Sequence, residues 1–527
     1  MARENIEKLI KRYDKAVATK DLYRSVHEAA YEYTIPARNL YRDQTQGSSR
    51  MNKIFDSTGI RAAQSFVTNM QASITPPFKK WVNLKLGPAF KGFKDNPETS
   101  DQYKQYAQTL EIATERGFSI LNSSNFNGIV PEFYSDLGVG TGIMLTLPNP
   151  YDDPVPMRFV VAPIEEVAIE KGPAGTVGAV FRTNKVPVRT IQETWPDAKI
   201  SDSIKKMIED DGSQEIELIE ASYTVKGATY YDIVKKDCKE RLVERQYKFN
   251  PWIVTRINKS PIDVYGTGPF IQATPDLRTL NKAKELTMRS AQLSVFGIYT
   301  VADNDIVNPN NLVLNPGTFI PVSRNSGPNG PSIAPLPTAG NFNAQNFFVQ
   351  DLQASIKEML FDDKLPPDTG PVRSATEIVE RISNIRKTTG VFFGPINQEF
   401  IQHLWTNILH ILVDRNEIAI PKELMTVDNF FVEVEVLSPI AKEQDIEDVQ
   451  SVVEAWQLYS QMAGPEAANM MFKMEEVGEY IADKIGAPVD LVRSKEEREI
   501  VMSDMQAAQA TQMMAEGEIE QQQLQEG

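Results

Sequence analysis

The sequence predicts an α+β fold in which a β-rich segment lies between helical stretches. Over residues 2–35 and 99–137, apolar side chains recur at three- and four-residue spacings, which is typical of amphipathic helices. Residues 157–257 instead hold short β-branched and aromatic runs separated by turn residues, a pattern of sequentially antiparallel strands. From Pro439 onward the composition favours helix again.

The first part of the chain contains further helices and one short strand. Asp56-Ser57-Thr58 offers a helix cap, and the apolar stripe that follows extends to Ile74, before Thr75-Pro76-Pro77 ends the helix. Residues 81–86 then have the pattern of a strand. The turn-prone Asn122–Asn127 divides the helical stretch 99–137 into two helices.

Within the β-rich segment we expect five strands and a short helix. The turn Gly172-Pro173-Ala174-Gly175 joins the first two strands as a hairpin. The expected strands are Val160–Ile169, Val177–Val186, Glu215–Val225, Thr229–Val234 and Trp252–Ile257, with the helix near Thr190–Trp195.

A polar helix follows within Tyr265–Gln292. We expect Thr274 to cap it and Pro275 to occupy its first position, where the fixed φ of proline suits a helix. One narrow face is small or apolar, formed by Leu277, Leu280, Ala283, Thr287 and Ala291. The other faces are charged, with Arg278, Lys282, Lys284 and Arg289.

Residues 295–346 form an insertion between this helix and the next predicted helix, Phe347–Phe361. A structureless loop of that length inside a domain is uncommon, so we expect a small module with strand-like pieces. Those pieces are Ile298–Val301, Leu312–Leu314 and Thr318–Val322.

The longest regular pattern begins after a proline-rich loop, Leu365–Pro371. Ser374 and Glu377 match a capping box, and apolar residues then recur to Leu412. Gly390, Gly394 and Pro395 interrupt the pattern and predict a kink or short break. His403 and His410 are two turns apart, too far to share a metal ion, so core or interface positions are expected. Residues 432–437 form one more expected strand.

Bulk composition narrows the class of protein. The 527-residue chain is 41% hydrophobic and 24% charged, as in ordinary globular proteins, and no apolar run approaches the ~18 residues of a membrane span. A single cysteine, Cys238, excludes an intrachain disulfide and a cysteine-based zinc site. The net charge of −16 comes mainly from residues 441–527, which hold 19 Asp/Glu against 6 Lys/Arg. This acidity disfavours tight nucleic-acid binding, which needs basic patches.

Motifs of catalysis are missing or out of context. No phosphate-binding G-x-x-x-x-G-K-[ST] loop occurs. Gly138, Gly140 and Gly142 follow a helix and precede a strand, the reverse of a nucleotide loop, so close packing at a corner is expected. Gly266 and Gly268 precede a helix, but Ile271 stands where a third glycine is needed. We therefore predict a protein that is not an enzyme and has no cofactor or metal.

Three stretches resemble the portal, or head-to-tail connector, proteins of short-tailed, podovirus-type bacteriophages. They are FDSTGIRAAQSFVTNMQASITPPFKKWVNLKL (55–86), YGTGPFIQATPDLRTLNKAKELTMRSAQ (265–292) and SATEIVERISNIRKTTGVFFGPINQEF (374–400). The order of the predicted elements also matches that family over almost the whole chain, and the last ~90 residues match least.

The resemblance implies a portal fold with an α/β wing, a two-helix stem, a small clip module, a long kinked channel helix and a helical crown. The implied parts are the wing at 1–260, stem helix 1 at 261–294, the clip at 295–346, stem helix 2 at 347–361, the tunnel loop at 362–373, the second part of the wing at 374–438 and the crown at 439–527.

Particular residues follow from that assignment. Candidate channel residues in the tunnel loop are Asp362, Asp363, Lys364, Asp368 and Arg373, and candidate stem residues are Arg278, Leu280, Lys282, Lys284 and Arg289. The basic residues Arg278, Lys282, Lys364 and Arg373 would space DNA from the wall, although ordinary pairing between subunits or with solvent is the more common role of such residues. The narrow apolar face of stem helix 1 would be covered by adjacent subunits. An acidic crown would repel the duplex and so keep it from binding tightly.

The resemblance also implies a role and partners. Portal proteins are rings of twelve subunits around a channel for double-stranded DNA, which enters and leaves the capsid there. The implied partners are a terminase ATPase, the major capsid and scaffolding proteins, tail adaptor or nozzle proteins and internal core proteins, without a membrane. The ring would assemble in the host bacterial cytoplasm and lie at the portal vertex of the virion.

Two other functions are consistent with the residues alone. One is a nucleotide-dependent enzyme that uses Gly138–Gly142 or Gly266–Gly268, and the other is an adaptor or scaffold that acts through the acidic, Met-rich tail.

Overall fold

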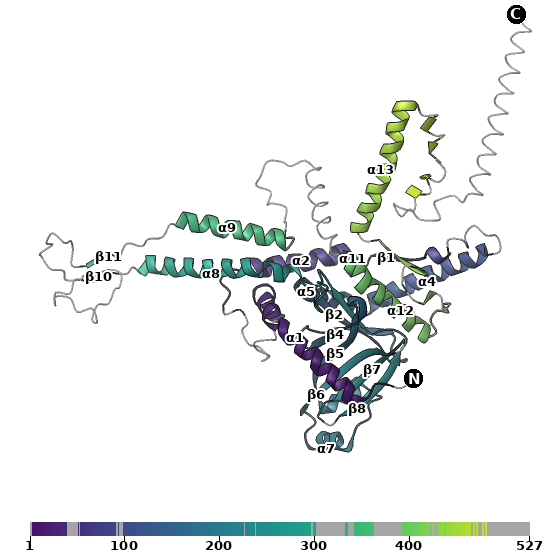
Figure 1. The fold of residues 1–527 in the computed structure, drawn as a ribbon, viewed down its shortest axis with the longest axis horizontal. Helices are drawn as coiled ribbons and strands as arrows, with labels where there is room; N and C mark the ends of the chain where they lie inside the picture. The colour runs from purple at the N-terminus through teal and green to yellow at the C-terminus, as the bar shows by residue number, and fades with distance from the viewer. Residues whose placement is uncertain are drawn as a thin grey trace, which may run out of the picture. The chain divides into compact units, whose positions relative to one another are not determined.

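A computed structural model gives the fold of the chain (Figure 1). The described residues are 3–38, 51, 53–90, 93, 99–225, 227–237, 239–296, 299–301, 333–335, 342–362, 393–421, 424–425, 427, 430–437, 439–464, 467–468, 471–472, 477–478 and 480–481. The chain divides into two units, Met1–Val436 and Leu437–Gly527. In the second unit, the long described element is the helix α13 (Pro439–Ala463).

The first unit contains both helices and sheets, as the sequence predicts. Its described helices are α1 (Ile6–Thr34), α2 (Thr58–Ile74), α4 (Ser100–Ser123), α5 (Phe126–Val139), α6 (Ile191–Thr194), α7 (Asp202–Asp211), α8 (Pro269–Phe296), α9 (Phe342–Met359), α11 (Phe393–Ile396), the π-helix η6 (Asn397–Ile401) and α12 (Gln402–Asp414). Short 3-10 turns lie at Pro36–Arg38, Pro88–Phe90, Pro173–Gly175 and Val188–Thr190.

All described strand pairs in the sheets are antiparallel. The strands are β1 (Val82–Leu86), β2 (Thr141–Pro148), β3 (Met157–Val161), β4 (Val167–Lys171), β5 (Val177–Pro187), β6 (Glu215–Val225), β7 (Ala228–Lys235), β8 (Glu240–Tyr247), β9 (Trp252–Arg256), β10 (Tyr299–Val301), β11 (Ile333–Pro335) and β12 (Val432–Val436). Strands β4 to β8 form a five-stranded sheet in sequence order, and β3-β2-β9 form a second sheet. The pairs β1-β12 and β10-β11 are two-stranded.

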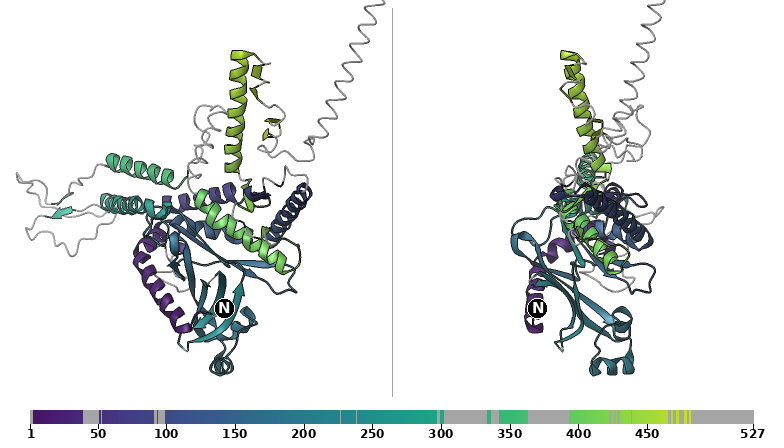
Figure 2. Two further views of the ribbon diagram at one scale, coloured as in Figure 1. Left: turned by 45° about the vertical axis from the view of Figure 1, so that its right-hand side comes forward. Right: turned by 90° about the vertical axis from the view of Figure 1, so that its right-hand side faces the viewer.

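The five-stranded sheet is covered on one face by α1 (Figures 1 and 2). Leu9, Tyr13 and Ala16 of α1 are buried against Phe181 and Ala221 of the sheet. Tyr13 also meets the ring of Phe181 edge-on at 5.9 Å. A helix has one apolar stripe and a sheet one apolar face, and each is buried only when the two elements pack together. The contact between α1 and the sheet therefore forms the core of the β-rich part.

The second core contains mainly aromatic residues and joins α12 to distant parts of the chain. The ring of Trp405 lies 5.2 Å from Phe118 of α4 and 6.2 Å from Trp81, which precedes β1. The ring of Phe400 in η6 stacks on Phe133 of α5 at 4.6 Å. These contacts hold residues near 400 against a framework formed by residues 81–139.

Two sequence predictions need correction, and three of the described elements were not predicted. The expected strand Val160–Ile169 is two strands in different sheets, because Pro163 cannot donate to a ladder and a turn forms there. Helix α8 begins at Pro269, so Pro275 lies inside it and the Thr274 hydroxyl donates to the carbonyl of Phe270 instead of capping. Strand β8, helix α7 and the short strand β11 were not predicted.

The remaining described elements agree with the predictions to within a few residues. The helix after the insertion begins earlier than expected, at Phe342. The interruption near Pro395 is a π turn at Asn397–Ile401 within a continuous helix. The capping box at Ser374, the strand-like pieces 312–314 and 318–322, and most of the Met-rich tail lie outside the described residues.

Candidate functional site

The candidate site is the two-helix arm, which we define as α8 and α9. The two helices lie side by side, and the first turns of α8 also contact α1 (Figures 1 and 2). On α8, Ala273, Leu277 and Leu280 are buried. On α9, Val349, Ile356 and Leu360 are buried as well. The half of the arm nearest the sheets is therefore packed within the subunit.

Polar contacts connect both helices of the arm to α2 and to the segment before it. The Asn281 side chain donates to the carbonyl of Lys53 at 2.9 Å and accepts from the amide of Phe55 at 2.7 Å. Gln353 donates to the Asp56 carboxylate at 2.8 Å. Further along, Asn69 of α2 donates to the carbonyl of Phe361 at 3.0 Å. These bonds hold the end of the arm that lies against α2, which we call the root of the arm.

The candidate stem cations lie on α8, and two of them share one carboxylate. Lys282 Nζ lies 2.9 Å and Arg289 Nη2 lies 2.6 Å from Glu285, whose pKa falls below its usual value because it accepts a hydrogen bond from Lys282. Arg278 is exposed and Lys284 is half-buried. Exposed pairs of this kind contribute little to stability, so these residues serve mainly to set the charge of the surface.

Leu280 is a candidate stem residue for which adjacent subunits were the expected partners, and in the single chain its side chain is already only 1% exposed. Among the arm side chains that the structure describes, the large apolar residues that are exposed lie further out. They are Leu286 (51%), Met288 (50%), Phe347 (74%) and Phe348 (49%). Sequence analysis missed them because Leu286 and Met288 lie off the apolar stripe. The adjacent pair Phe347 and Phe348 in α9 was the sequence feature that could have indicated this exposed surface.

Of the candidate tunnel-loop residues, only Asp362 lies within the described part. Its side chain is 7% exposed, and its amide donates to the carbonyl of Lys357 at 2.8 Å, which closes the end of α9. Asp363, Lys364, Asp368 and Arg373 lie outside the described residues.

The glycines that suggested a nucleotide site pack against each other. A side chain at Gly140, which has φ 141°, would meet the carbonyl oxygen of Gly266 at 2.3 Å, and one at Gly268 would meet that of Gly138 at 2.1 Å. The amide of Gly268 donates to the carbonyl of Val139 at 2.8 Å. The two glycine segments therefore form a backbone-to-backbone corner that leaves no space for a phosphate, as close packing predicts.

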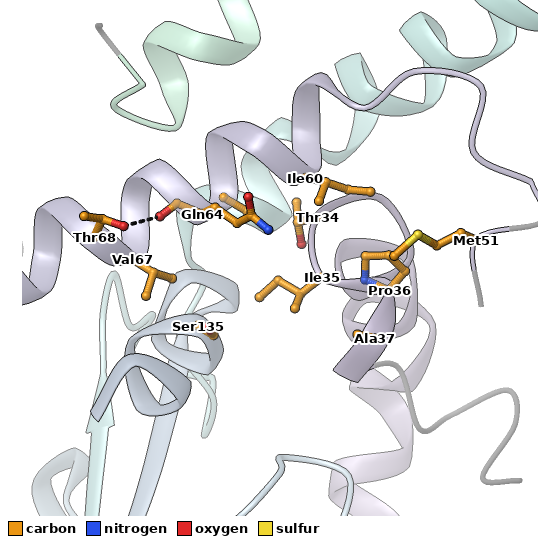
Figure 3. Close-up of a pocket in the computed structure, with 11 residues that line it drawn as sticks. Thr34, Ile35, Pro36, Ala37, Met51, Ile60, Gln64, Val67, Thr68 and Ser135 are labelled. Carbon is orange, nitrogen blue, oxygen red and sulfur yellow. Dashed lines mark hydrogen bonds between the residues drawn. The ribbon is translucent and has the colours of Figure 1, made fainter. Parts of the chain in front are cut away.

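A groove of about 300 Å³ lies beside the root of the arm, between α2, the end of α1 and α5 (Figure 3). Ile35, Ile60 and Val67 give it an apolar lining, while Gln64 and Ser135 supply polar groups. Of the described residues that line it, none has an ionisable side chain. The groove therefore suits an apolar side chain better than a reacting substrate.

A larger cavity of about 670 Å³ lies between the β2–β3 turn, β8 and the end of α12. Two of its carboxylates are paired: Asp197 accepts from Arg245 Nε at 2.8 Å, and Asp414 from Lys248 at 2.9 Å. The hydrogen bond from Arg245 lowers the pKa of Asp197. Asp197 therefore remains ionised, and the two ion pairs link the walls of the cavity.

The described residues contain no group of three or more His, Cys, Asp or Glu side chains that could hold a metal ion. His410 is buried and stacks on Phe249 at 5.6 Å, which fits the expected core histidine, whereas His403 is exposed. Among the helices in the described ranges, none is both long enough and apolar enough to cross a membrane.

Comparison with known proteins gives one family and several distant relatives. Residues 6–492 match the family described as bacteriophage head to tail connecting protein. A probable portal protein of Bordetella phage BPP-1 is 23% identical over 526 residues, with 93% of this chain and 90% of that protein covered.

Solved structures give weaker similarity. A chain of the virion of a native gene transfer agent particle has a TM-score of 0.31 at 12% identity, with 79% of this chain and 90% of that chain covered. A chain of the neck of an empty gene transfer agent particle has a TM-score of 0.33 at 12% identity, with 83% and 92% covered. The family match extends over most of the sequence, including both helices of the arm. This chain therefore belongs to the bacteriophage head to tail connecting protein family.

Proposed function

We propose that this chain is the portal protein of a phage capsid, and that copies of it form a ring around a channel for double-stranded DNA. The ring lies at the portal vertex of the virion, where it joins head to tail. The protein is a structural conduit and catalyses no reaction of its own. The family membership supports the head-to-tail role.

The observation that carries ring formation is the exposed apolar surface of the outer arm. Leu286, Met288, Phe347 and Phe348 are each about half exposed or more, on two helices whose inner halves are buried. Several large exposed apolar side chains on two paired helices that also carry exposed charges indicate an interface. In a closed cyclic ring, each copy presents one such surface to its neighbour and covers another.

The net charge of the chain favours passage of DNA through the ring and disfavours tight binding of DNA to the channel wall. The net charge of −16 gives a ring a strongly negative total, so the wall repels a duplex at distances within the screening length. Exposed cations on α8, of which Arg278 is one, provide local positive charge on that background. We propose that these cations and the tunnel-loop cations Lys364 and Arg373 meet the DNA backbone transiently.

The partners follow from the role. A terminase ATPase drives DNA through the ring during packaging, and tail adaptor or nozzle proteins bind afterwards. Major capsid, scaffolding and internal core proteins contact the part of the ring inside the head. We propose the clip at 295–346 as the docking surface of the terminase and the crown at 439–527 as the internal part.

The mass of the assembly tests the proposal. Twelve copies of the 59.1 kDa chain have a mass of about 709 kDa, which light scattering separates easily from a monomer or dimer. Electron micrographs of the same sample should show rings with a central channel. A protein that remains monomeric at high concentration, with no rings in the micrographs, contradicts the proposal.

A further inference from the structure

The helix that follows the proposed channel segment contains an unusual turn. Between α11 and α12, residues Asn397–Ile401 form a π turn in which the amide of Gln402 donates to the carbonyl of Asn397, five residues earlier. A π turn contains one residue more than an α-helical path would need, is rare, and persists where surrounding contacts hold it. The contacts made inside this turn therefore identify what it does.

Glu399, in the middle of the turn, is bound by two residues from β9 and the loop after it. Its carboxylate accepts from the Arg256 guanidinium (Nη2) at 2.8 Å, from the Arg256 amide at 2.8 Å and from Lys259 Nζ at 2.8 Å. The side chains of Arg256 and Glu399 are 2% and 14% exposed. Burial alone would raise the pKa of Glu399, but these bonds outweigh it and hold the pKa below its usual value, so the carboxylate is ionised.

Arg256 itself is fixed by two other segments. Its guanidinium donates to the carbonyl of Gly175 at 3.0 Å and to that of Val264 at 3.3 Å. Gly175 belongs to the turn between β4 and β5, and Val264 to the loop before α8. Because these backbone groups hold the guanidinium in place, Glu399 must come to Arg256 for the pair to form.

The rest of the helix interface leaves several buried polar groups without a matching partner. Among the described residues, Asn397 Oδ1, Gln402 Nε2, Trp405 Nε1 and His410 Nδ1 on the helix have no hydrogen-bond partner, and neither do Thr146 Oγ1, Trp252 Nε1 and Thr255 Oγ1 on β2 and β9. Because these polar groups are not paired across the interface, their hydrogen bonds do not fix which residue of the helix lies against which residue of the strands. Beyond the turn, Asn407 donates to the carbonyl of Asn250 at 3.1 Å and Asp414 accepts from Lys248 at 2.9 Å, and these bonds anchor α12.

We propose that Arg256, Lys259 and Glu399 form a register clamp, which holds Asn397–Ile401 as a π turn and thereby sets the rotation of the helix on its N-terminal side. If the turn relaxes to an α-helix while α12 stays anchored, the chain before Asn397 advances by one residue. That step rotates it by about 100° and shifts it by about 1.5 Å. The clamp residues are positioning residues for the segment that enters α11.

The significance of the clamp rests on the proposed function, because α11 follows the tunnel loop assigned to 362–373 and belongs to the part at 374–438 that is assigned to the long kinked helix. A rotation of α11 changes the direction of every side chain on this helix, which follows that loop in the chain. Each copy of the ring carries its own clamp, so neighbouring copies can hold different registers. The clamp itself is a property of one subunit and is tested there.

The test measures a distance across the turn in the full chain. In a Cys238→Ser background, nitroxide labels are placed at Gly394→Cys and at Glu111→Cys, both exposed, on α11 and α4. A cysteine at Gly394 has space for its Cβ, since nothing lies within 4 Å. Labelled copies are diluted with unlabelled ones, and pulsed electron resonance gives the distance in the parent and in Glu399→Gln.

The clamp predicts a new distance in Glu399→Gln, because a side chain at the outer radius of a helix moves on the order of 8 Å in a 100° rotation. The matched control is Glu166→Gln, which disrupts a half-buried pair with Arg182 at 2.9 Å in the five-stranded sheet. The control should leave the distance unchanged. An unchanged distance in Glu399→Gln, with or without lower stability, makes the pair an ordinary structural ion pair and overturns the clamp.

A second variant covers the case in which Glu399→Gln does not fold. Lys259→Met removes one bond from a side chain that is 43% exposed and leaves Arg256 in place. It should populate the second distance as a minority, and a single parental distance overturns the clamp. Light scattering of the parent keeps the two proposals separate: absence of rings removes the portal function, while a changed distance still establishes the clamp.

Discussion

In the first unit, the sheets and the arm differ in how far their side chains are paired or covered within the chain. In the sheet region, charged groups find partners inside the chain: Arg182 of β5 lies 3.6 Å from Glu220 of β6, which is 2% exposed. On the outer arm, Leu286 and Phe347 remain largely exposed although they are apolar. The comparison indicates that the sheet region folds by itself, whereas the outer arm needs a partner to cover it.

The largest expected effect is a side chain at the glycine corner. Gly140→Val places a branched side chain at φ 141° and against the carbonyl of Gly266, so we expect a loss of more than about 4 kcal/mol in the free energy of unfolding. Soluble yield and urea denaturation measure it. Gly128→Ala is the control, because Gly128 lies in α5 with nothing within 4 Å of its added Cβ. Equal stability of the two variants would contradict the corner.

Next in size is the buried ion pair near α1. Tyr31 donates to Asp136 at 2.9 Å, and Arg38 donates to the same carboxylate. Arg38→Met leaves this buried carboxylate without its cation, which should cost about 3–5 kcal/mol in chemical denaturation. The exposed pair Lys80–Glu115, broken by Lys80→Met, should cost less than about 1 kcal/mol. A cost for Arg38→Met as small as this would show that the pair is solvated.

An intermediate effect depends on pH. Burial lowers the pKa of His27 to about 4, and its ring packs against Tyr23 and Tyr265 at 5.9 and 5.6 Å. The unfolded chain, with a histidine pKa near 6.5, binds a proton that the folded chain rejects. Stability is therefore complete above pH 6.5 and falls by up to about 3 kcal/mol as the pH drops to 4.

His27→Phe removes this titration and keeps a ring in the cluster. Thermal or urea denaturation between pH 4 and 7 should show a shallower loss for the variant than for the parent. Parallel curves of stability against pH for the two proteins would mean that His27 takes up a proton in the folded chain as readily as in the unfolded chain.

The smallest effect on the subunit is expected on the arm, together with a large effect on assembly. Leu286→Ser and Phe347→Ser replace side chains that are 51% and 74% exposed, so the stability of the isolated subunit should change by no more than about 0.5 kcal/mol. The mass by light scattering should nevertheless fall below that of the ring. Leu22→Ser, at a residue of α1 that is 78% exposed, is the matched control and should still form rings. Rings that survive both arm substitutions would remove the arm from the interface.

Prediction from sequence succeeded where local chemistry decides the structure. The helical periodicity of 2–35, the Gly172–Gly175 hairpin and the helix break near Ser124 all appear in the structure, because spacing and turn residues act over short distances. The glycine corner was also predicted from the order of helix, glycines and strand. The start of α8 was misplaced because two prolines compete, and Pro269, after Gly268, begins the helix instead of Pro275.

The exposed apolar set on the arm could not be predicted, since burial depends on which residues other elements cover. Leu280 and Leu286 are both leucines of one helix, yet they are 1% and 51% exposed. The difference follows from how far α1, α2 and α9 extend along α8, which no pattern within the helix encodes. The pattern of the helix therefore could not predict that Leu280 is covered within the chain while Leu286 is exposed.

By itself, the sequence determined the class of fold, the order of the elements, the acidic end of the chain and the family. Tertiary structure alone decided that β1 pairs with β12, more than three hundred residues away, and that Glu399 reaches Arg256 in β9. Local spacing constrains dihedral angles and faces of an element, and these are short-range properties. Which distant groups meet depends on the packing of the whole chain, where a buried charge is stable only beside its partner.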